Sequence, residues 1–410
     1  MTISQNRHLT FKSNIGKGRH GWLRLTPAYS YNLVRQLLTD VKDGSVVLDP
    51  FAGTGTTGLV AAELGLDAYL SDINDFLVWL SRAKCSNYAR EDLALADRQS
   101  EICIQIAQTY GVEKLTIPPM HRIDRWWDTR VIVDLARLMR AITESCSNSI
   151  VQDLLLVAFC RVMIAMSKAT FNHQSMSLQR DSAVQQSGFE LLSHTSAVFD
   201  RFHQEVKEVI ESASESHQGR VTVTVEDARN IDSVSDGSID VICTSPPYSN
   251  RMSYIRELRP YMYWLGFLIN GRQAGELDWK AIGGTWGSAT SRLSQWDNKA
   301  DLPMKCDYRS VIEEIAAAGR PNATLLSNYV HKYFYDMHTH FSEAYRVVKS
   351  GGIVKYVVGN STFYGNLVPT EQWYAELLAT VGFRKVSIRT VRKRNSNKRL
   401  YEFTVEAVRP

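Results

Sequence analysis

Residues 45–58 read Ser-Val-Val-Leu-Asp-Pro-Phe-Ala-Gly-Thr-Gly-Thr-Thr-Gly, and this stretch decides the fold. Its first five residues form an apolar run of strand length that ends at Asp49, and the glycines behind it predict a tight turn before an apolar helix that reaches Leu64. Residues 67–72 predict a second strand, which also ends in an acid, Asp72. A strand, a glycine turn, a helix and a strand ending in an acid predict a doubly wound α/β sheet with a ligand across the carboxyl ends of its strands.

The glycine turn by itself leaves two cofactors open. Gly53, Gly55 and Gly58 have the spacing G-x-G-x-x-G, and Asp72 follows at about the distance expected of a ribose-binding acid, which suits a nicotinamide-dependent dehydrogenase. The same turn suits S-adenosylmethionine, because glycine lets the backbone approach an adenosine-containing ligand closely.

A second motif ends the strand predicted over residues 239–243, and it reads Thr244-Ser245-Pro246-Pro247-Tyr248. Because two prolines can neither continue a ladder nor start a helix at the first of them, the backbone is held extended with its carbonyl oxygens available and an aromatic ring beside them. Such a site suits a flat substrate whose amino group donates to the carbonyls while its face lies on the tyrosine. A nucleobase fits this description.

Taken together, residues 49–55 and 244–248 resemble the cofactor and catalytic motifs of the exocyclic-amine DNA methyltransferases. The resemblance implies a Rossmann-like class I methyltransferase fold, with a seven-stranded, mostly parallel sheet, an antiparallel terminal hairpin and, in this chain, a large helical insertion. It implies S-adenosylmethionine as the cofactor, and the dehydrogenase leaves the Pro-Pro-Tyr turn unexplained. It covers residues 20–85 and 220–410 and leaves the helical segment between them unassigned.

The resemblance also implies roles for single residues. The cofactor-binding residues it implies are Asp49, Pro50, Phe51, Gly53, Gly55, Thr56, Asp72, Asp227 and Trp22. Asp72 would hold the ribose hydroxyls, and Asp227 would reach the adenine amino group or, alternatively, is an ordinary turn acid. Trp22 belongs to residues 20–27, which would close over the methionine end of the cofactor or lead into a helix that packs on the sheet.

The catalytic residues that the resemblance implies are Ser245, Pro246, Pro247 and Tyr248. The Pro246 carbonyl and the Ser245 hydroxyl would accept the protons of the target amine, and Tyr248 would stack on a base flipped out of the duplex. Serine before Pro-Pro-Tyr is typical of enzymes that methylate the N4 amine of cytosine, whereas Asp or Asn is typical of adenine enzymes.

We therefore expect a cytosine-N4 DNA methyltransferase of a restriction-modification system, with double-stranded DNA as substrate and any cognate restriction endonuclease acting separately. Serine also occurs with adenine targets, so methylation of the N6 amine of adenine is the first alternative. An RNA guanine-N2 methyltransferase and a catalytically inactive nucleic-acid-binding protein follow.

Three regions are expected along the chain. Residues 1–85 form the first part of the methyltransferase domain, 86–218 a helical insertion without strands, and 219–410 the remainder. Helices are predicted over 131–142, 150–166 and 189–210 in the insertion. Residues 270–304 are rich in Gly and Trp and predict a surface loop, and we expect this loop and the insertion to recognise the DNA sequence.

The net charge is only +4, but residues 384–399 contain eight Lys or Arg and no acid, between strands predicted over 383–391 and 400–408. The expected phosphate contacts are Arg251, Arg392, Lys393, Arg394, Lys398 and Arg399, with a solvated loop as the alternative reading of the segment. Six scattered cysteines without paired metal-ligand spacing, and the lack of a long apolar run, predict a cytoplasmic protein that binds neither a metal nor a membrane.

Overall fold

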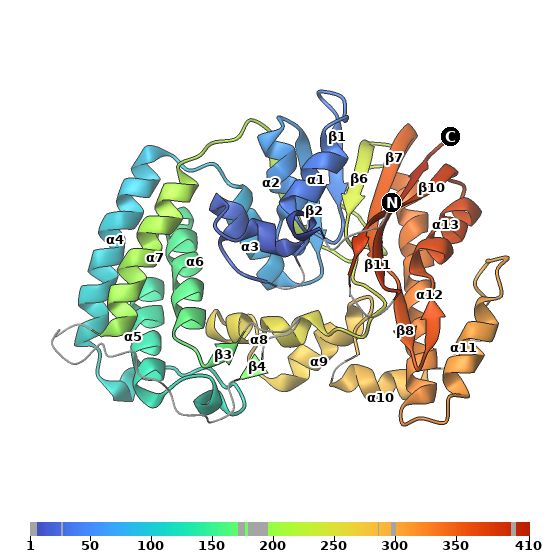
Figure 1. The fold of residues 1–410 in the computed structure, drawn as a ribbon. Coiled ribbons are helices and arrows are strands. Elements are labelled where there is room, and N and C mark those ends of the chain that lie inside the picture. Colours follow the sequence, from blue (N-terminus) through green and yellow to red (C-terminus); the bar gives the residue numbers. More distant parts are fainter. Residues whose placement is uncertain are drawn as a thin grey trace.

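The computed structural model describes residues 6–25, 28–170, 177–178, 196–285, 287–296, 301–394 and 399–410. Within them, one seven-stranded sheet has the strand order β10-β11-β7-β6-β1-β2-β5 (Figure 1). The strands are β1 (Val46–Asp49), β2 (Asp67–Asp72), β5 (Val221–Val225), β6 (Ile239–Thr244), β7 (Val348–Gly359), β10 (Arg384–Lys393) and β11 (Tyr401–Val408). All neighbouring pairs are parallel except the two that β11 makes, with β7 and with β10. The predicted fold class, including the antiparallel terminal hairpin, is confirmed.

Helices cover both faces of the sheet. On one face, α1 (Tyr31–Leu38) and α2 (Thr56–Glu63) pack over Val47 of β1 and Val241 of β6. On the other face, α12 (Ala323–Val347) and α13 (Thr370–Val381) pack over Leu48 and Ile242. Because successive residues of a strand point to opposite faces, β1 and β6 carry apolar residues on both faces, and this is why their sequences identified them as buried strands.

The helical insertion forms a bundle beside the sheet (Figure 1). It contains α4 (Arg90–Thr109), α5 (Thr129–Ser145), α6 (Ser149–Ala165) and α7 (Ala197–Ala213), and α3 (Asp75–Cys85) joins it to β2. Two short strands, β3 (Ala169–Thr170) and β4 (Ser177–Leu178), pair antiparallel, so the expectation of helices alone is wrong in this detail. A strand of two residues is too short to show the alternation of polar and apolar residues by which strands are recognised in a sequence. The first residues of the helix predicted over 189–210 lie outside the described residues.

Helix α8 (Tyr254–Trp264) follows the Pro-Pro-Tyr turn and connects it to the insertion (Figure 1). Trp264 meets Trp127 and Phe159 of the insertion core edge-on, with ring centroids 5.8 Å apart in both pairs. Nearer its middle, Tyr261 stacks on Phe76 of α3 at 5.5 Å. One apolar core therefore runs from the insertion to the helix that begins beside the catalytic motif.

The surface loop predicted over 270–304 contains two helices, α9 (Gly271–Lys280) and α10 (Ser288–Gln295), and the prediction is wrong there. The Asn270 side chain caps α9 by accepting the N–H of Gln273 at 2.9 Å. Trp279 lies beneath the side chains of Arg292 and Lys332, whose charged ends are 5.5 and 4.9 Å from the ring centroid. Tertiary packing and a cap thus outweigh the loop-like composition.

The remaining described elements are short. They are α11 (Tyr308–Ala316), the hairpin of β8 (Ser361–Phe363) and β9 (Asn366–Val368), and the single 3₁₀ turns Arg7–Leu9, Phe11–Asn14, Gly18–Gly21, Val112–Lys114 and Ile123–Arg125. Among the described residues, no helix is both long enough and apolar enough to cross a bilayer.

Candidate active site

A pocket of about 250 Å³ lies at the carboxyl ends of β1, β2 and β6 and brings both motifs together. The residues predicted for the site that line it are Pro50, Phe51, Gly53, Thr56, Asp72, Asp227, Ser245, Pro246, Pro247, Tyr248, Arg392 and Arg394. Amino-terminal residues 9–11, 25 and 28–29 complete one wall. The cofactor loop and the catalytic turn, far apart in the sequence, therefore face one space.

The glycine loop is shaped by backbone conformations that favour glycine. Gly53 and Gly55 have φ angles of 51° and 74°, in the left-handed region. A Cβ atom on Gly55 would lie only 2.9 Å from the Ser81 hydroxyl oxygen, so this glycine is also needed for close packing against α3. Helix α2 begins directly after it, at Thr56.

Asp72 ends β2 and presents its carboxylate to the pocket. The carboxylate accepts the backbone N–H groups of Gly53 and Asn74, each at 3.0 Å. Burial raises the pKa of Asp72 to about 6, although these two N–H groups favour the ionised form. These two hydrogen bonds fix the orientation of the Asp72 carboxylate, whose oxygens can accept hydrogen bonds from the hydroxyl groups of a ligand in the pocket.

Asp49 does not line the pocket but lies beneath it, fully buried. Its carboxylate accepts the hydroxyls of Thr57 and Thr244, each at 2.5 Å, and the N–H of Phe51 at 3.0 Å. Thr57 belongs to α2, directly after the glycine loop, and Thr244 ends β6, directly before the Ser-Pro-Pro-Tyr turn. Asp49 therefore joins the two motifs, and its predicted direct contact with the cofactor is replaced by a structural role.

Asp227 lies just beyond β5 at the pocket wall. It accepts the Nε and Nη2 groups of Arg229 at 2.9 and 2.6 Å, and Arg229 in turn contacts Asp336 at 3.0 Å. Burial alone would raise the pKa of Asp227, but the hydrogen bonds and charge of Arg229 outweigh it and hold this pKa below its ordinary value. The Asp227 carboxylate is therefore an ionised acceptor with a fixed orientation at the end of the pocket next to β5.

The Ser-Pro-Pro-Tyr turn is held by tyrosine hydroxyls. Tyr333 donates to the Pro247 carbonyl at 2.7 Å, and the Tyr254 hydroxyl accepts the N–H of Tyr248 at 3.3 Å. The expectation of free carbonyls thus fails for Pro247. The Pro246 carbonyl has no hydrogen-bond partner among the described residues, so it remains an available acceptor in the pocket.

The Tyr248 side chain is tied to the terminal hairpin. Its hydroxyl donates to Glu402 of β11 at 2.8 Å and also interacts with the Ser245 hydroxyl. Glu402 accepts two N–H groups of Arg392, and the Arg394 guanidinium lies 5.0 Å from the Tyr248 ring centroid. Sequence reasoning missed Glu402, because no local pattern distinguishes one acid in a strand.

Trp22, a predicted cofactor ligand, lies elsewhere. It is only 2% exposed in the core of the insertion, does not line the pocket, and donates its Nε1–H to the Ser212 hydroxyl at 2.7 Å. An aromatic ring at a polar amino terminus gives no sign of which surface will bury it. This assignment is therefore corrected to a packing role.

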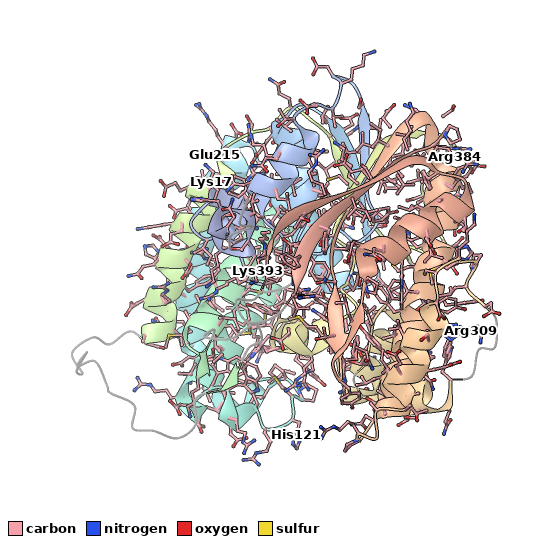
Figure 2. The ribbon with its side chains drawn as sticks, turned by 45° about the vertical axis from the view of Figure 1, so that its right-hand side comes forward. Lys17, His121, Glu215, Arg309, Arg384 and Lys393 are labelled. Carbon is pink, nitrogen blue, oxygen red and sulfur yellow. The ribbon has the colours of Figure 1, made fainter. Side chains whose placement is uncertain are left out.

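The residues predicted to bind phosphate lie in two places, the pocket wall and the exposed surface. Arg392 and Arg394 line the pocket, and Arg392 is ion-paired with Glu402. Arg251 and Arg399 are exposed, and Figure 2 shows Lys393 and Arg384 at opposite ends of β10. Lys398 lies outside the described residues. In the part of the chain that the structure describes, no cluster of three His, Cys, Asp or Glu side chains could hold a metal ion.

A Rossmann-like sheet of this order, with a glycine loop and a Ser-Pro-Pro-Tyr turn at one pocket, defines a class I methyltransferase. The family model described as DNA methylase, which covers N6 and N4 enzymes, matches residues 28–82. These residues contain β1, the glycine loop, β2 and most of α3.

Relatives extend the match along the chain. The Type II methyltransferase M.BsoBI of Geobacillus stearothermophilus is 22% identical over 439 positions, covering 97% of this chain and 85% of that protein. The Type II methyltransferase M.MvaI of Kocuria varians is 23% identical, covering 84% and 76%. That of Methanothermobacter wolfeii, M.MwoI, is 44% identical over 55 residues, or 13% of this chain. These matches support an exocyclic-amine DNA methyltransferase family for this chain, and the enzymes of that family use S-adenosylmethionine as methyl donor.

Proposed function

We propose that this DNA methyltransferase acts on the N4 amine of a cytosine that it flips out of duplex DNA, as the site-specific methyltransferase of a restriction-modification system. The observation that carries the choice of cytosine is Ser245, a hydroxyl where adenine enzymes typically have a carboxylate or an amide. The Type II names of the relatives support the restriction-modification context. A cognate endonuclease that acts separately is part of the proposal.

The pocket residues suit S-adenosylmethionine. Asp72, an oriented acceptor at the end of β2, would bind the ribose hydroxyls, and Asp227 would accept the adenine amino group. Pro50, Phe51, Gly53 and Thr56 would form the surface against which the cofactor lies. When bound, the cofactor supplies a methyl group that its sulfonium already activates, so no covalent protein nucleophile is needed.

The catalytic turn acts on the target amine. The Pro246 carbonyl and the Ser245 hydroxyl accept hydrogen bonds from its N–H groups and favour the pyramidal nitrogen that develops in the transition state over the planar ground state. Tyr248 supplies a ring face for the base. Flipping costs a few kcal/mol, which stacking and these hydrogen bonds offset.

DNA recognition is assigned to several surfaces. Lys393, Arg394, Arg399 and Arg251 would contact phosphates, which supplies affinity but no sequence information. The insertion and the α9–α10 segment would read the bases. The N6 amine of adenine is the second candidate target, because the Ser245 hydroxyl and the Pro246 carbonyl accept from either amine.

Product analysis tests the proposal. Duplex DNA and RNA are incubated with the protein and isotopically labelled S-adenosylmethionine, digested, and examined by mass spectrometry for the modified nucleoside. We expect N4-methylcytosine from DNA. N6-methyladenine would replace the cytosine assignment by the adenine one, and methylation of RNA alone would contradict a DNA substrate.

Two variants test the site. Tyr248→Ala and Ser245→Ala should lower kcat by about a hundredfold, the scale of losing one oriented transition-state contact, while cofactor affinity in calorimetry stays unchanged. Tyr364→Ala, at an exposed tyrosine of the β8–β9 hairpin outside the pocket, is the matched control. Wild-type turnover in both site variants would exclude this turn as the catalytic motif.

A further inference from the structure

A buried carboxylate in the pocket wall has no role in the chemistry described so far. Glu402 is 5% exposed and lies in β11 between Arg392 of β10 and Gly359 of β7, which are its register partners. Its carboxylate accepts the Tyr248 hydroxyl at 2.8 Å and the Nε and Nη2 groups of Arg392 at 2.7 and 3.1 Å. These three donors compensate the Glu402 carboxylate for the loss of water, because a buried charge without partners would destabilise the fold.

A β-bulge produces the pairing of Arg392 with Glu402. The register of β10 with β11 shifts between Thr390, opposite Phe403, and Arg392, opposite Glu402. In a regular ladder Val391 would occupy the position opposite Glu402 and could not pair with a carboxylate. The bulge therefore redirects a guanidinium into the pocket wall, a known use of bulges beside active sites.

The tyrosine ring is also covered on one face. The Arg394 guanidinium lies 5.0 Å from the Tyr248 ring centroid and donates to the Asn360 carbonyl at 2.9 Å. A Cβ atom on Gly359 would lie 2.3 Å from Nη1 of Arg394 and 3.0 Å from Cδ2 of Tyr248. Tyr248 is thus fixed at its hydroxyl and covered by Arg394 on one face of its ring, and the residue also lines the pocket.

The hydrogen bond to Glu402 has a fixed direction. Burial and the Glu402 charge raise the pKa of Tyr248 well above its ordinary value, so the phenol stays protonated near neutral pH and donates. The carboxylate can only accept from it.

We propose that Glu402 is a positioning residue for the methyl transfer: through the Tyr248 hydroxyl it fixes the ring plane on which the target base stacks, on the face away from Arg394. This inference rests on the proposed function of Tyr248 as the base-stacking residue. A ring free to tilt would still bind the base but would present its amine to Ser245 and Pro246 less accurately, and errors of about 1 Å cost on the order of a hundredfold in rate.

Removing only the Tyr248 hydroxyl tests whether Glu402 positions the ring, because the ring itself remains able to stack on a base. Tyr248→Phe keeps the aromatic face and loses the bond to Glu402, and Glu402→Leu loses the acceptor. We expect each variant, and the double variant, to lower kcat by about tenfold, with the KM for S-adenosylmethionine unchanged. Glu402→Gln keeps an acceptor for the Tyr248 hydroxyl, so its kcat should be about threefold higher than that of Glu402→Leu.

Glu205→Leu is the matched control for loss of a buried carboxylate that pairs with arginine. Glu205 is 2% exposed and is paired with Arg161 and Arg201 inside the insertion, outside the pocket lining. We expect this variant to lower the melting temperature without the fall in kcat. A fall in kcat of equal size would show that the Glu402 effect is general loss of stability, and would overturn the inference.

Two further outcomes would overturn it: wild-type kcat in Tyr248→Phe, or losses that multiply in the double variant, which would mean that Glu402 acts by another route. The proposed function fails differently. Wild-type turnover in Tyr248→Ala, or the absence of any methylated nucleoside with the wild-type protein, would refute that function and the positioning role together. Failure of the positioning role alone leaves Tyr248→Ala about a hundredfold slower than wild type, with either a fully active Tyr248→Phe or losses that multiply in the double variant.

Discussion

Replacing Asp49 by Asn should remove a pH dependence from folding. The side chain is fully buried, and burial raises the pKa of Asp49 from its ordinary value of 3.8 to about 6, against the hydroxyls of Thr244 and Thr57 and the N–H of Phe51. The unfolded chain ionises this group near its ordinary pKa. Between about pH 4 and pH 6 the folded protein therefore holds a proton that the unfolded chain has lost.

A carboxyl whose folded-state pKa is raised stabilises the fold fully only below its unfolded pKa, and this contribution is lost as the pH rises through the folded value. A difference of about two pKa units corresponds to about 3 kcal/mol of unfolding free energy. We expect wild type to lose up to this amount relative to Asp49→Asn between pH 4 and pH 7, because above about pH 6 wild type carries a buried charge and the variant does not.

Urea unfolding followed by tryptophan fluorescence, at several pH values from 4 to 8, measures the difference. Its slope should reach about 1.4 kcal/mol per pH unit at most and vanish above pH 7. Thr244→Val removes a donor that favours the ionised carboxylate, so it should shift the transition to higher pH. A difference that is flat across this range, or one in which wild type gains on the variant as the pH rises, would refute the reasoning.

Two other predictions concern ligands. Asp72→Ala should weaken S-adenosylmethionine binding by about ten- to a hundredfold in calorimetry, the value of hydrogen bonds to a charged group. Because burial raises the pKa of Asp72 to about 6, wild-type affinity should also fall as the pH drops below that value; unchanged affinity in the variant would remove Asp72 from the cofactor site. Replacing Lys393 and Arg399 together by Gln should reduce the slope of log K against log salt for DNA binding by up to about 1.8, and an unaltered slope would exclude phosphate contacts there.

Local sequence patterns were enough to predict the central strands of the sheet. Strands β1 and β6 are buried on both faces, and β2 lies between two parallel neighbours, so apolar runs bounded by glycine or proline identified them. The direction of the Asp49 carboxylate was not predictable. It depends on Thr244, 195 positions away, which only the folded sheet brings next to it.

Elsewhere tertiary contacts decided the outcome. Glycine and tryptophan between residues 270 and 304 indicate a loop, yet α9 forms because Asn270 caps it and Trp279 packs under neighbouring cations. The position of Trp22 depends on α7, which lies far away in the sequence. The Arg392–Glu402 pair depends on a one-residue bulge, and a bulge leaves no regular signal in strand alternation.

Helix α8 sets a mechanical relation between the two halves of the molecule. The hydroxyl of Tyr254, at its first turn, accepts the N–H of Tyr248, and Trp264, at its last, is packed among the rings of the insertion. The helix therefore links the insertion core directly to the backbone of Tyr248. A displacement of the insertion would be transmitted through this helix to the backbone of Tyr248.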